Sequence, residues 1–401
     1  MRFLVVNTDY LEFLQWFYVQ HPGLATRPYQ DQMQARMESL CGVADFYSRS
    51  LRRLGHEAWD VHANNTWMQR AWAQENGIRT PADSVLQSKV EQMTSLVNHV
   101  LTDRSSNTSR QRNLRSAIAL LDRTVSERRS SRRLARILLA QVKHYAPDVL
   151  LNQAMDAISP RVLMRLKPHL RLLVGQIAAP LPERWDYDCY DLVLSSLPTF
   201  VDSFRKRGIR SEFHRFSGFE PTILRELEGD FDRIPVSFVG GLGSHYSGRI
   251  RLLEQLCERI NLHVWGPSVH GLPADSPLRD RYRGMAWGLD MYRILKGSKI
   301  TVNHHADFAG PHAQNMRLFE ATGVGTLLVT DWKEDLHDVF EPDREVVVYR
   351  SPEECTALIK HYLENENERE TIARSGQQRT LKDHTYERRI REFLSIVERY
   401  T

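Results

Sequence analysis

Cysteine is scarce in this sequence, and long apolar runs are absent. Four cysteines occur among 401 residues, and no two of them form a CxxC pair. The sequence therefore gives no sign of a zinc knuckle or a disulfide framework. The longest apolar runs span only a few residues, whereas a membrane span needs about 20. The run Phe3–Val6 is also too short for a signal-peptide core, so we expect a cytoplasmic protein without a membrane span.

The sequence also has only a small excess of positive charge. The formal net charge is +4, with 41% hydrophobic and 26% charged residues. This composition is ordinary for a globular protein and excludes a disordered tail, a collagen-like fibre and a coiled-coil rod. A single hydrophobic core rarely grows beyond about 250–300 residues, so a chain of this length predicts two domains.

Apolar runs of strand length alternate with amphipathic stretches along most of the chain. In the first half the expected strands are Phe3–Val6, Glu57–Val61, Val149–Leu151, Leu172–Val174, Leu192–Leu194 and Glu212–Phe216. In the second half they are Val236–Val239, Leu262–Trp265, Ile300–Val302, Thr326–Val329 and Val346–Tyr349. Helices between them, such as Gln32–Leu54, favour parallel sheets covered on both faces. We expect an α/β protein with two doubly wound parallel sheets.

Glycine and proline between residues 217 and 234 predict a domain boundary. We expect an N-terminal domain over residues 1–220, with a helical insert at about 66–145. A second domain would span 231–384, and a closing helix over 385–401 would pack back on the first. Ligands bind beyond the carboxyl ends of parallel strands, so the site should lie where the two sheets face each other.

The insert is strongly basic. Residues 110–143 hold ten Arg and Lys against two acids. Such blocks usually form a solvated helix face. Attraction to a polyanionic acceptor, or peripheral contact with a membrane surface, is the alternative. A nucleic-acid partner is not expected, because no aromatic residues are interleaved with the basic ones.

Two segments of the second half have the residues of a phosphate site. After the strand Val236–Val239, the glycines Gly240, Gly241 and Gly243 would let the backbone approach a phosphate, and Arg249 could neutralise it. A plain glycine turn is the alternative. After Ile300–Val302 comes a polar segment with Asn303, Asp307 and His312. It leads into a helix whose first N–H groups suit a diphosphate, at Ala313, Gln314, Asn315 and Met316.

Glu320 stands further along that helix among apolar neighbours. Two sugar hydroxyls would be good partners for its carboxylate, and a side chain turned to solvent is the alternative. His304, His305 and His312 lack a typical zinc spacing, and Asp186-Tyr187-Asp188 is short enough to occur by chance. We therefore expect no metal and no other cofactor.

The string Asn315–Gly323, followed by a strand that ends in Thr330-Asp331, is specific. With Tyr349–Glu354 and His384–Tyr386, it resembles the C-terminal domain of the group 1 glycosyl transferases related to the spore-maturation protein CgeB. The match covers roughly the last half of the chain. It implies a GT-B fold of two facing Rossmann-like domains. It also implies metal-independent transfer of a hexosyl-type sugar, from a nucleotide diphosphate sugar such as a UDP-sugar, to an acceptor hydroxyl.

The resemblance also implies roles for single residues. In the wider retaining group, two glutamates spaced E-x7-E hold the donor. Glu320 matches the second, which contacts the ribose hydroxyls. His312 stands at the place of the first, which contacts the sugar. Gly241 stands where the group has a phosphate-binding Arg, so Arg249 is the substitute.

The acceptor would lie against the first domain and is a carbohydrate, a lipid-linked compound or a small molecule. Polar residues near the ends of its strands are Asn7, Asp9, Asn152 and Gln176. For the catalytic groups we name His312, Asp307 and Asp9. Two other functions stay open: a sugar-nucleotide epimerase on the same fold, and a non-catalytic protein that binds nucleotide sugars or carbohydrate.

Overall fold

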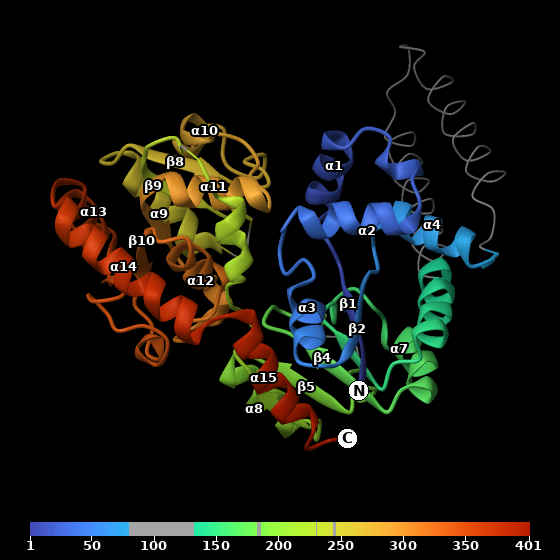
Figure 1. The fold of residues 1–401 in the computed structure, drawn as a ribbon. Coiled ribbons are helices and arrows are strands. Elements are labelled where there is room, and N and C mark those ends of the chain that lie inside the picture. The colour runs from blue at the N-terminus through green and yellow to red at the C-terminus, as the bar shows by residue number, and fades with distance from the viewer. Residues whose placement is uncertain (80–131, 183–185, 230, 244–245) are drawn as a thin grey trace, which may run out of the picture.

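The computed structural model describes residues 1–79, 132–182, 186–229, 231–243 and 246–401. These residues form two α/β domains side by side (Figure 1). Each domain is built on a parallel sheet, as the alternation of apolar runs and helices predicted.

The first sheet has the strand order β2-β1-β3-β4-β5-β6, and all neighbouring strands are parallel. Its strands are β1 (Arg2–Asn7), β2 (Glu57–His62), β3 (Val149–Asn152), β4 (Leu172–Gln176), β5 (Leu192–Ser195) and β6 (Ser211–Phe213). Alternate residues of β1 enter different cores: Phe3 and Val5 one, Leu4 and Val6 another. Helices therefore cover both faces, which is why the strands are continuous apolar runs.

The second sheet has the order β11-β10-β9-β7-β8 and is also parallel throughout. Its strands are β7 (Ile234–Val239), β8 (Leu262–Trp265), β9 (Ser298–Asn303), β10 (Leu327–Asp331) and β11 (Val347–Tyr349). The strands predicted in both halves are thus present. The strand predicted over Glu212–Phe216 was too long at its end, because β6 ends at Phe213.

The helices complete both layers. In the first domain they are α1 (Leu11–Gln20), α2 (Tyr29–Glu38), α3 (Phe46–Arg53), α4 (Thr66–Glu75), residues 132–145, α7 (Pro160–Leu166) and α8 (Pro198–Lys206). In the second part of the chain they are α9 (Ser247–Cys257), α10 (Leu278–Arg281), α11 (Leu289–Gly297), α12 (Met316–Gly323), α13 (Pro352–Glu364), α14 (Glu366–Asp383) and α15 (Tyr386–Val397). Both ends of the predicted insert are helical, while most of residues 66–145 lies outside the described residues.

The single helix predicted over Gln32–Leu54 was wrong. The chain forms α2 and α3 instead, and they are separated by residues in the left-handed region, with φ of 52° at Leu40 and 41° at Ala44. At this break the carbonyl of Ser39 accepts a hydrogen bond from the backbone N–H of Leu289 in the second domain, at 3.2 Å. A contact between domains therefore overrides the helical pattern of the sequence.

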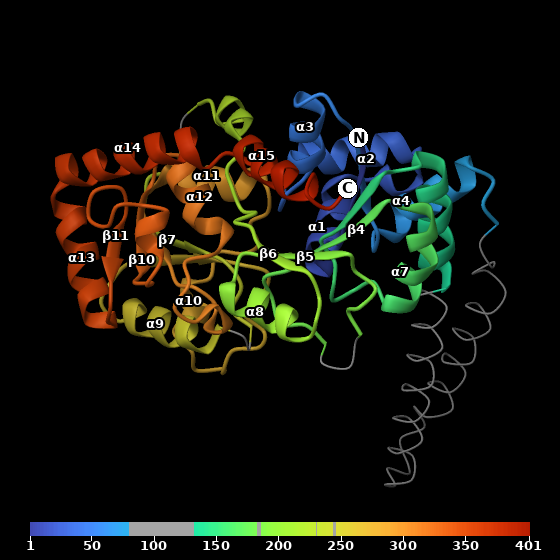
Figure 2. The same cartoon turned by 90° about the horizontal axis from the view of Figure 1, so that it is seen from below.

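The segment that joins the domains lies under α3 and α15. Tyr47 on α3 donates its hydroxyl to the carbonyl of Phe216 at 2.9 Å, and Arg389 on α15 donates Nε to the carbonyl of Ser217 at 3.0 Å. The backbone of Phe219 bonds on both sides to the turn before α15. Helix α15 itself packs against α3, so the last helix touches the first domain (Figures 1 and 2).

Two buried histidines beside this segment make its stability depend on pH. Burial lowers the pKa of His214 and of His384 to about 4 each, and the charge of Arg389 adds to the shift of His384. Both are therefore neutral at pH 7, and both must take up a proton more readily when unfolded. Stability from each histidine is complete above the unfolded pKa of 6.5 and is lost as the pH falls from there toward 4.

We expect wild-type protein to lose about 2 kcal/mol per histidine between pH 7.5 and pH 5, as urea unfolding would measure. Asp60 acts in the opposite direction, because burial raises its pKa to about 6. The informative quantity is therefore the difference between wild type and His384→Gln across this pH range. If the two proteins show the same pH dependence, the buried neutral state of His384 is wrong.

Candidate functional site

The two domains meet through segments that follow the carboxyl ends of their strands. After β5, the hydroxyl of Ser196 donates to Oε1 of Gln314 at 3.2 Å. After β6, Nη1 of Arg215 donates to the carbonyl of Ala313 at 3.1 Å. After β1, the ring of Tyr10 stacks on Trp287 with centroids 5.8 Å apart. The segment before α12 thus lies at the domain junction.

Asparagine side chains fix the start of α12 to the sheet. Asn315 caps the helix by accepting from the N–H of Leu318, and its Nδ2 donates to Oδ1 of Asn303 at 2.9 Å. Asn303 in turn donates to Thr330 on β10, also at 2.9 Å. Both predicted donor-binding amides are therefore engaged within the protein. Among described residues, the N–H groups of Met316 and Arg317 stay without a partner, as expected in a first helical turn.

Glu320 and Arg317 form a buried pair with unused hydrogen-bonding capacity. Glu320 is 5% exposed, which excludes the solvent-facing alternative. Nη1 of Arg317 lies 3.0 Å from Oε2 of Glu320. This contact lacks the alignment of a hydrogen bond, and Nε and Nη1 of Arg317 have no hydrogen-bond partner among described residues. Burial raises the pKa of Glu320, and Arg317 opposes that shift. Buried polar atoms are normally bonded, so a ligand is the natural partner here.

His312 is held by a carboxylate that also binds the backbone. Oδ1 of Asp335 accepts from the N–H of Ala313 at 2.6 Å, and its Oδ2 lies 3.3 Å from Nδ1 of His312. The N–H of Ala313 is therefore not free for a phosphate, contrary to our expectation. Arg215 of the first domain contacts the same carboxylate at 3.4 Å. This arrangement orients the imidazole of His312 at the junction.

Arg249 braces the glycine turn rather than extending from it. Its guanidinium is buried and donates to the carbonyls of His304 and Gly241, at 2.6 to 2.9 Å. It also stacks on Tyr246, 4.0 Å from the ring centroid. Arg249 thus links the predicted glycine turn, Gly240 to Gly243, to the segment after β9. Its guanidinium is used within the protein and does not extend toward a ligand.

Asp307, which we named as a catalytic group, lies at the start of α9. Its Oδ2 accepts from the N–H and the hydroxyl of Ser247 at 3.0 and 2.6 Å, and its Oδ1 accepts from the N–H of Gly248 at 3.3 Å. Burial would raise the pKa of Asp307, but these hydrogen bonds outweigh it and lower the pKa. The carboxylate acts as a helix cap supplied from a distant loop.

Asp9 is enclosed in the first domain. It is 8% exposed, with Oδ1 at 2.6 Å from Nη2 of Arg36 and Oδ2 at 3.1 Å from Nδ1 of His62. Burial alone would raise the pKa of Asp9, but Arg36 and His62 outweigh it and hold the pKa well below its usual range. A carboxylate bound in this way is a poor base, so the geometry favours a structural role over the catalytic one we expected.

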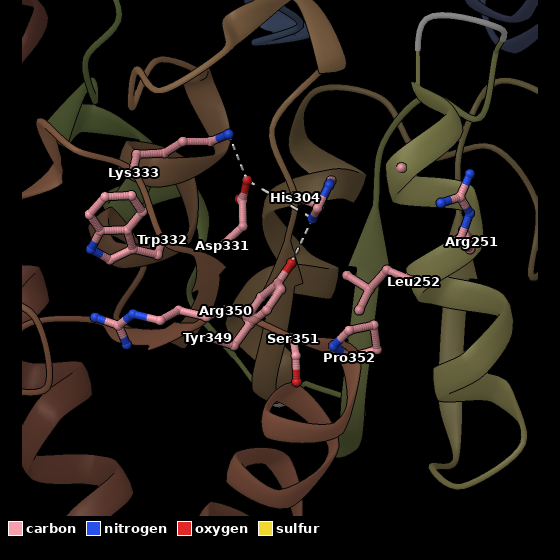
Figure 3. A pocket seen from close by; sticks show the side chains of 11 residues that line it. Arg251, Leu252, His304, Asp331, Trp332, Lys333, Tyr349, Arg350, Ser351 and Pro352 are labelled. Atoms are coloured by element: carbon pink, nitrogen blue, oxygen red, sulfur yellow. Dashed lines mark hydrogen bonds and ion pairs between the residues drawn. The ribbon is translucent and has the colours of Figure 1, made fainter.

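A cavity of about 390 Å³ opens where β9, β10 and β11 end (Figure 3). Lys333 lies 3.2 Å from Oδ2 of Asp331, and His304 bonds to the hydroxyl of Tyr349 at 2.9 Å. Trp332 is 44% exposed at its rim. The other lining residues are Gly248, Arg251, Leu252, Arg350, Ser351 and Pro352.

Most of these residues belong to no motif in the sequence, although one signal does point to them. Asp331, Trp332 and Lys333 stand at the end of an apolar strand, the same position that drew attention to Asn303. Burial would raise the pKa of Asp331, but His305, at 2.7 Å, outweighs it and holds the pKa well below its usual range. The cavity thus holds a charged carboxylate with Lys333 beside it, and Arg251 and Arg350 also line it.

The histidines singled out in the sequence have separate partners. His304 bonds to Tyr349, His305 to Asp331 and His312 to Asp335. Across the part of the chain that the structure describes, no three His, Cys, Asp or Glu side chains are grouped as metal ligands. Within that same part, no helix is both long enough and apolar enough to cross a bilayer.

Two facing domains with parallel sheets define the GT-B class of fold. A glycosyltransferase from Rickettsia africae ESF-5 has this architecture, with a TM-score of 0.54, 10% identity, and coverage of 100% of this chain and 98% of that one. Anabaena Alr3699/HepE, solved in complex with UDP and glucose, gives 0.54 at 11% identity, covering 99% of both chains. A putative UDP-N-acetylglucosamine 2-epimerase from Listeria monocytogenes gives 0.51 at 9% identity, covering 99% of this chain and 95% of that one. At such identities the likeness shows the fold.

Part of the sequence also resembles a known family. Residues 249–395 match the family described as glycosyl transferase-like. This matched region includes α12 with Arg317 and Glu320. No curated protein matches the chain.

Proposed function

We propose that this protein transfers a glycosyl group from a nucleotide diphosphate sugar to an acceptor hydroxyl. The observation that carries the proposal is the buried pair Arg317 and Glu320 at the domain junction. Nε and Nη1 of Arg317 make no hydrogen bond with any described residue, and the buried carboxylate of Glu320 has an ion pair with Arg317. Together they offer donors to a diphosphate and acceptors to the hydroxyls of a ribose.

The chemistry of transfer needs positive charge on one side of the breaking bond. As the sugar leaves, negative charge develops on the diphosphate. Arg317 and the free N–H groups at the start of α12 would stabilise that charge, helped by the helix dipole. Because the protein supplies this charge, the proposal includes transfer without a metal. His312, oriented by Asp335, would face the sugar.

The comparisons support the donor class. The glycosyl transferase-like match covers these residues, and one protein of the same fold is described as a complex with UDP-glucose. We therefore favour a uridine diphosphate sugar and a hexosyl group. Membership of the CgeB-like group and a cytoplasmic location belong to the proposal, and the acceptor is left open.

An epimerase is the second candidate, because a putative sugar-nucleotide 2-epimerase shares the fold. An epimerase needs the same donor site but no acceptor. Incubation with UDP-sugars alone separates the two functions. Conversion of the sugar to its epimer in the absence of any acceptor would contradict the transferase.

Replacing Glu320 by Gln should weaken nucleotide binding. The change keeps the size of the side chain and removes the charge that would accept from the ribose. Hydrogen bonds to charged groups contribute about 1.5–3 kcal/mol, so we expect UDP to bind roughly 10- to 100-fold more weakly in calorimetry. Bound nucleotide should also raise the melting temperature of wild type by mass action.

The matched control is Glu370→Gln, which removes the same charge from an exposed position on α14. It should bind UDP like wild type. The melting temperature of each variant without ligand shows whether it folds. Unchanged binding in a folded Glu320→Gln variant would contradict the assignment of the site. If wild type binds none of the uridine, guanosine, thymidine, cytidine and adenosine diphosphates, the proposed function fails.

A further inference from the structure

A second cavity lies in the first domain, between the end of α4 and the helix formed by residues 132–145. It has a volume of about 320 Å³. Its lining residues are Gly77, Ile78, Arg79, Arg136, Leu139, Ala140 and Lys143. Figures 1 and 2 place α4 and this helix on the side of the first domain turned away from the second. The cavity is therefore remote from the domain junction.

Three cations line this cavity, and none of its lining residues in the described part of the chain is acidic. Arg79, Arg136 and Lys143 are exposed and make no hydrogen bond or ion pair with any described residue. An exposed cation can find an acidic partner, as Arg391 does with Glu387 at 2.8 Å, but these three have none among the described residues. Three unneutralised charges around one hollow repel each other and create a positive potential that favours an anion.

The local structure fixes where these charges stand. Helix α4 ends in a turn in which the N–H of Gly77 donates to the carbonyl of Gln74 at 3.2 Å, and that of Ile78 to Ala73 at 2.8 Å. Gly77 adopts the φ of +64° that such a turn requires. The turn brings Arg79 back to the cavity.

The opposite wall comes from one helix face. Arg136 and Lys143 are two turns apart, so they lie on the same side of the helix. Leu139 and Ala140 lie between them and, with Ile78, add apolar surface to the lining. The cavity therefore combines cations with an apolar wall.

We propose that this cavity binds the phosphate group of a phosphate ester, with the carbon chain of the ester against the apolar wall. Guanidinium groups match phosphate in geometry and can bind it with two hydrogen bonds. The volume lies at the lower end of the usual range for ligand sites, about 300–1,000 Å³, and fits a small ester better than a whole nucleotide sugar. The ester belongs either to a lipid headgroup in a bilayer or to a soluble metabolite. The site is separate from the donor site and goes beyond the proposed function.

Two probes distinguish the sources. Glycerol 3-phosphate represents the soluble ester, and phosphatidylcholine vesicles that contain phosphatidic acid represent the lipid. Pure phosphatidylcholine vesicles are the neutral control. The test variant is Arg136→Gln with Lys143→Gln. The matched variant, Lys360→Gln with Arg374→Gln, removes the same two charges from exposed positions on α13 and α14.

We expect wild type to bind one of the two charged probes, and the test variant to bind it about tenfold more weakly. The matched variant should bind like wild type. Binding of glycerol 3-phosphate assigns the site to a soluble ester, and binding of the charged vesicles alone assigns it to a lipid. If wild type binds neither probe, or if both variants weaken binding equally, the proposal is wrong.

Discussion

Replacing Arg36 by Met should destabilise the first domain by about 3–5 kcal/mol. The side chains of Arg36 and Asp9 are both 2% exposed and are in contact at 2.6 Å. Removing one partner leaves the other charge buried without compensation, which is the costly way to break a buried pair. Arg36 also donates to the carbonyl of Cys41, so the change loosens the break between α2 and α3. Urea unfolding monitored by circular dichroism measures the loss.

The matched control is Arg391→Met, which breaks an exposed pair on α15 with Glu387. Exposed pairs contribute about 0–1 kcal/mol, so this variant should resemble wild type. A double variant, Asp9→Asn with Arg36→Met, should lose less than Arg36→Met alone, because no charge is left buried. A loss below 1 kcal/mol in the single variant would show that water reaches Asp9 and would reopen its role as a base.

The sheets could be predicted because their signal is local. A strand buried on both faces must be apolar along its whole length, as Val149–Asn152 and Leu172–Gln176 are. Parallel strands also need helices between them, so the alternation alone indicates the fold. Because the strand pattern also marks where each strand ends, it predicted that the polar residues after β9 lie at the carboxyl edge of the second sheet.

The break between α2 and α3 could not be predicted from the local sequence pattern. Residues 32–54 have a helical pattern, yet Leu40 and Ala44 take positive φ values. Ser39, directly before this break, contacts residues 288 and 289, almost 250 positions away. Propensity is a weak prior when tertiary contacts compete with it.

Single site residues were harder still, because charged side chains find partners across the fold. Asp307 and Arg249 stand where a substrate contact is plausible from the sequence. In the structure one caps α9 and the other holds two carbonyls. The sequence indicated the burial of Glu320 more clearly. A carboxylate flanked by apolar residues on a short helix is costly to bury without a partner, so it suggests a binding site. Nothing in the sequence marks Arg317 as a site residue. Its proposed role depends on the Nε and Nη1 groups, which make no hydrogen bond with any described residue, and only the structure shows this.

Gly288→Ala should disrupt the contact between the domains. Gly288 has φ of +51° and ψ of −122°, which side chains rarely adopt. A Cβ atom there would lie 1.8 Å from the backbone oxygen of Ser39 and 2.9 Å from its carbonyl carbon. Because both obstacles are backbone, no rotamer change relieves the clash, and the domains must separate locally. We expect a loss of at least about 3 kcal/mol, from strain and overpacking together.

Gly271→Ala is the control, because nothing lies within 4 Å of the added Cβ and the residue has an ordinary φ. It should unfold in urea like wild type. Small-angle scattering of Gly288→Ala should show a larger radius of gyration than wild type if the variant stays folded. Unchanged stability together with an unchanged radius would mean that residues 39 and 288 are not in contact in solution.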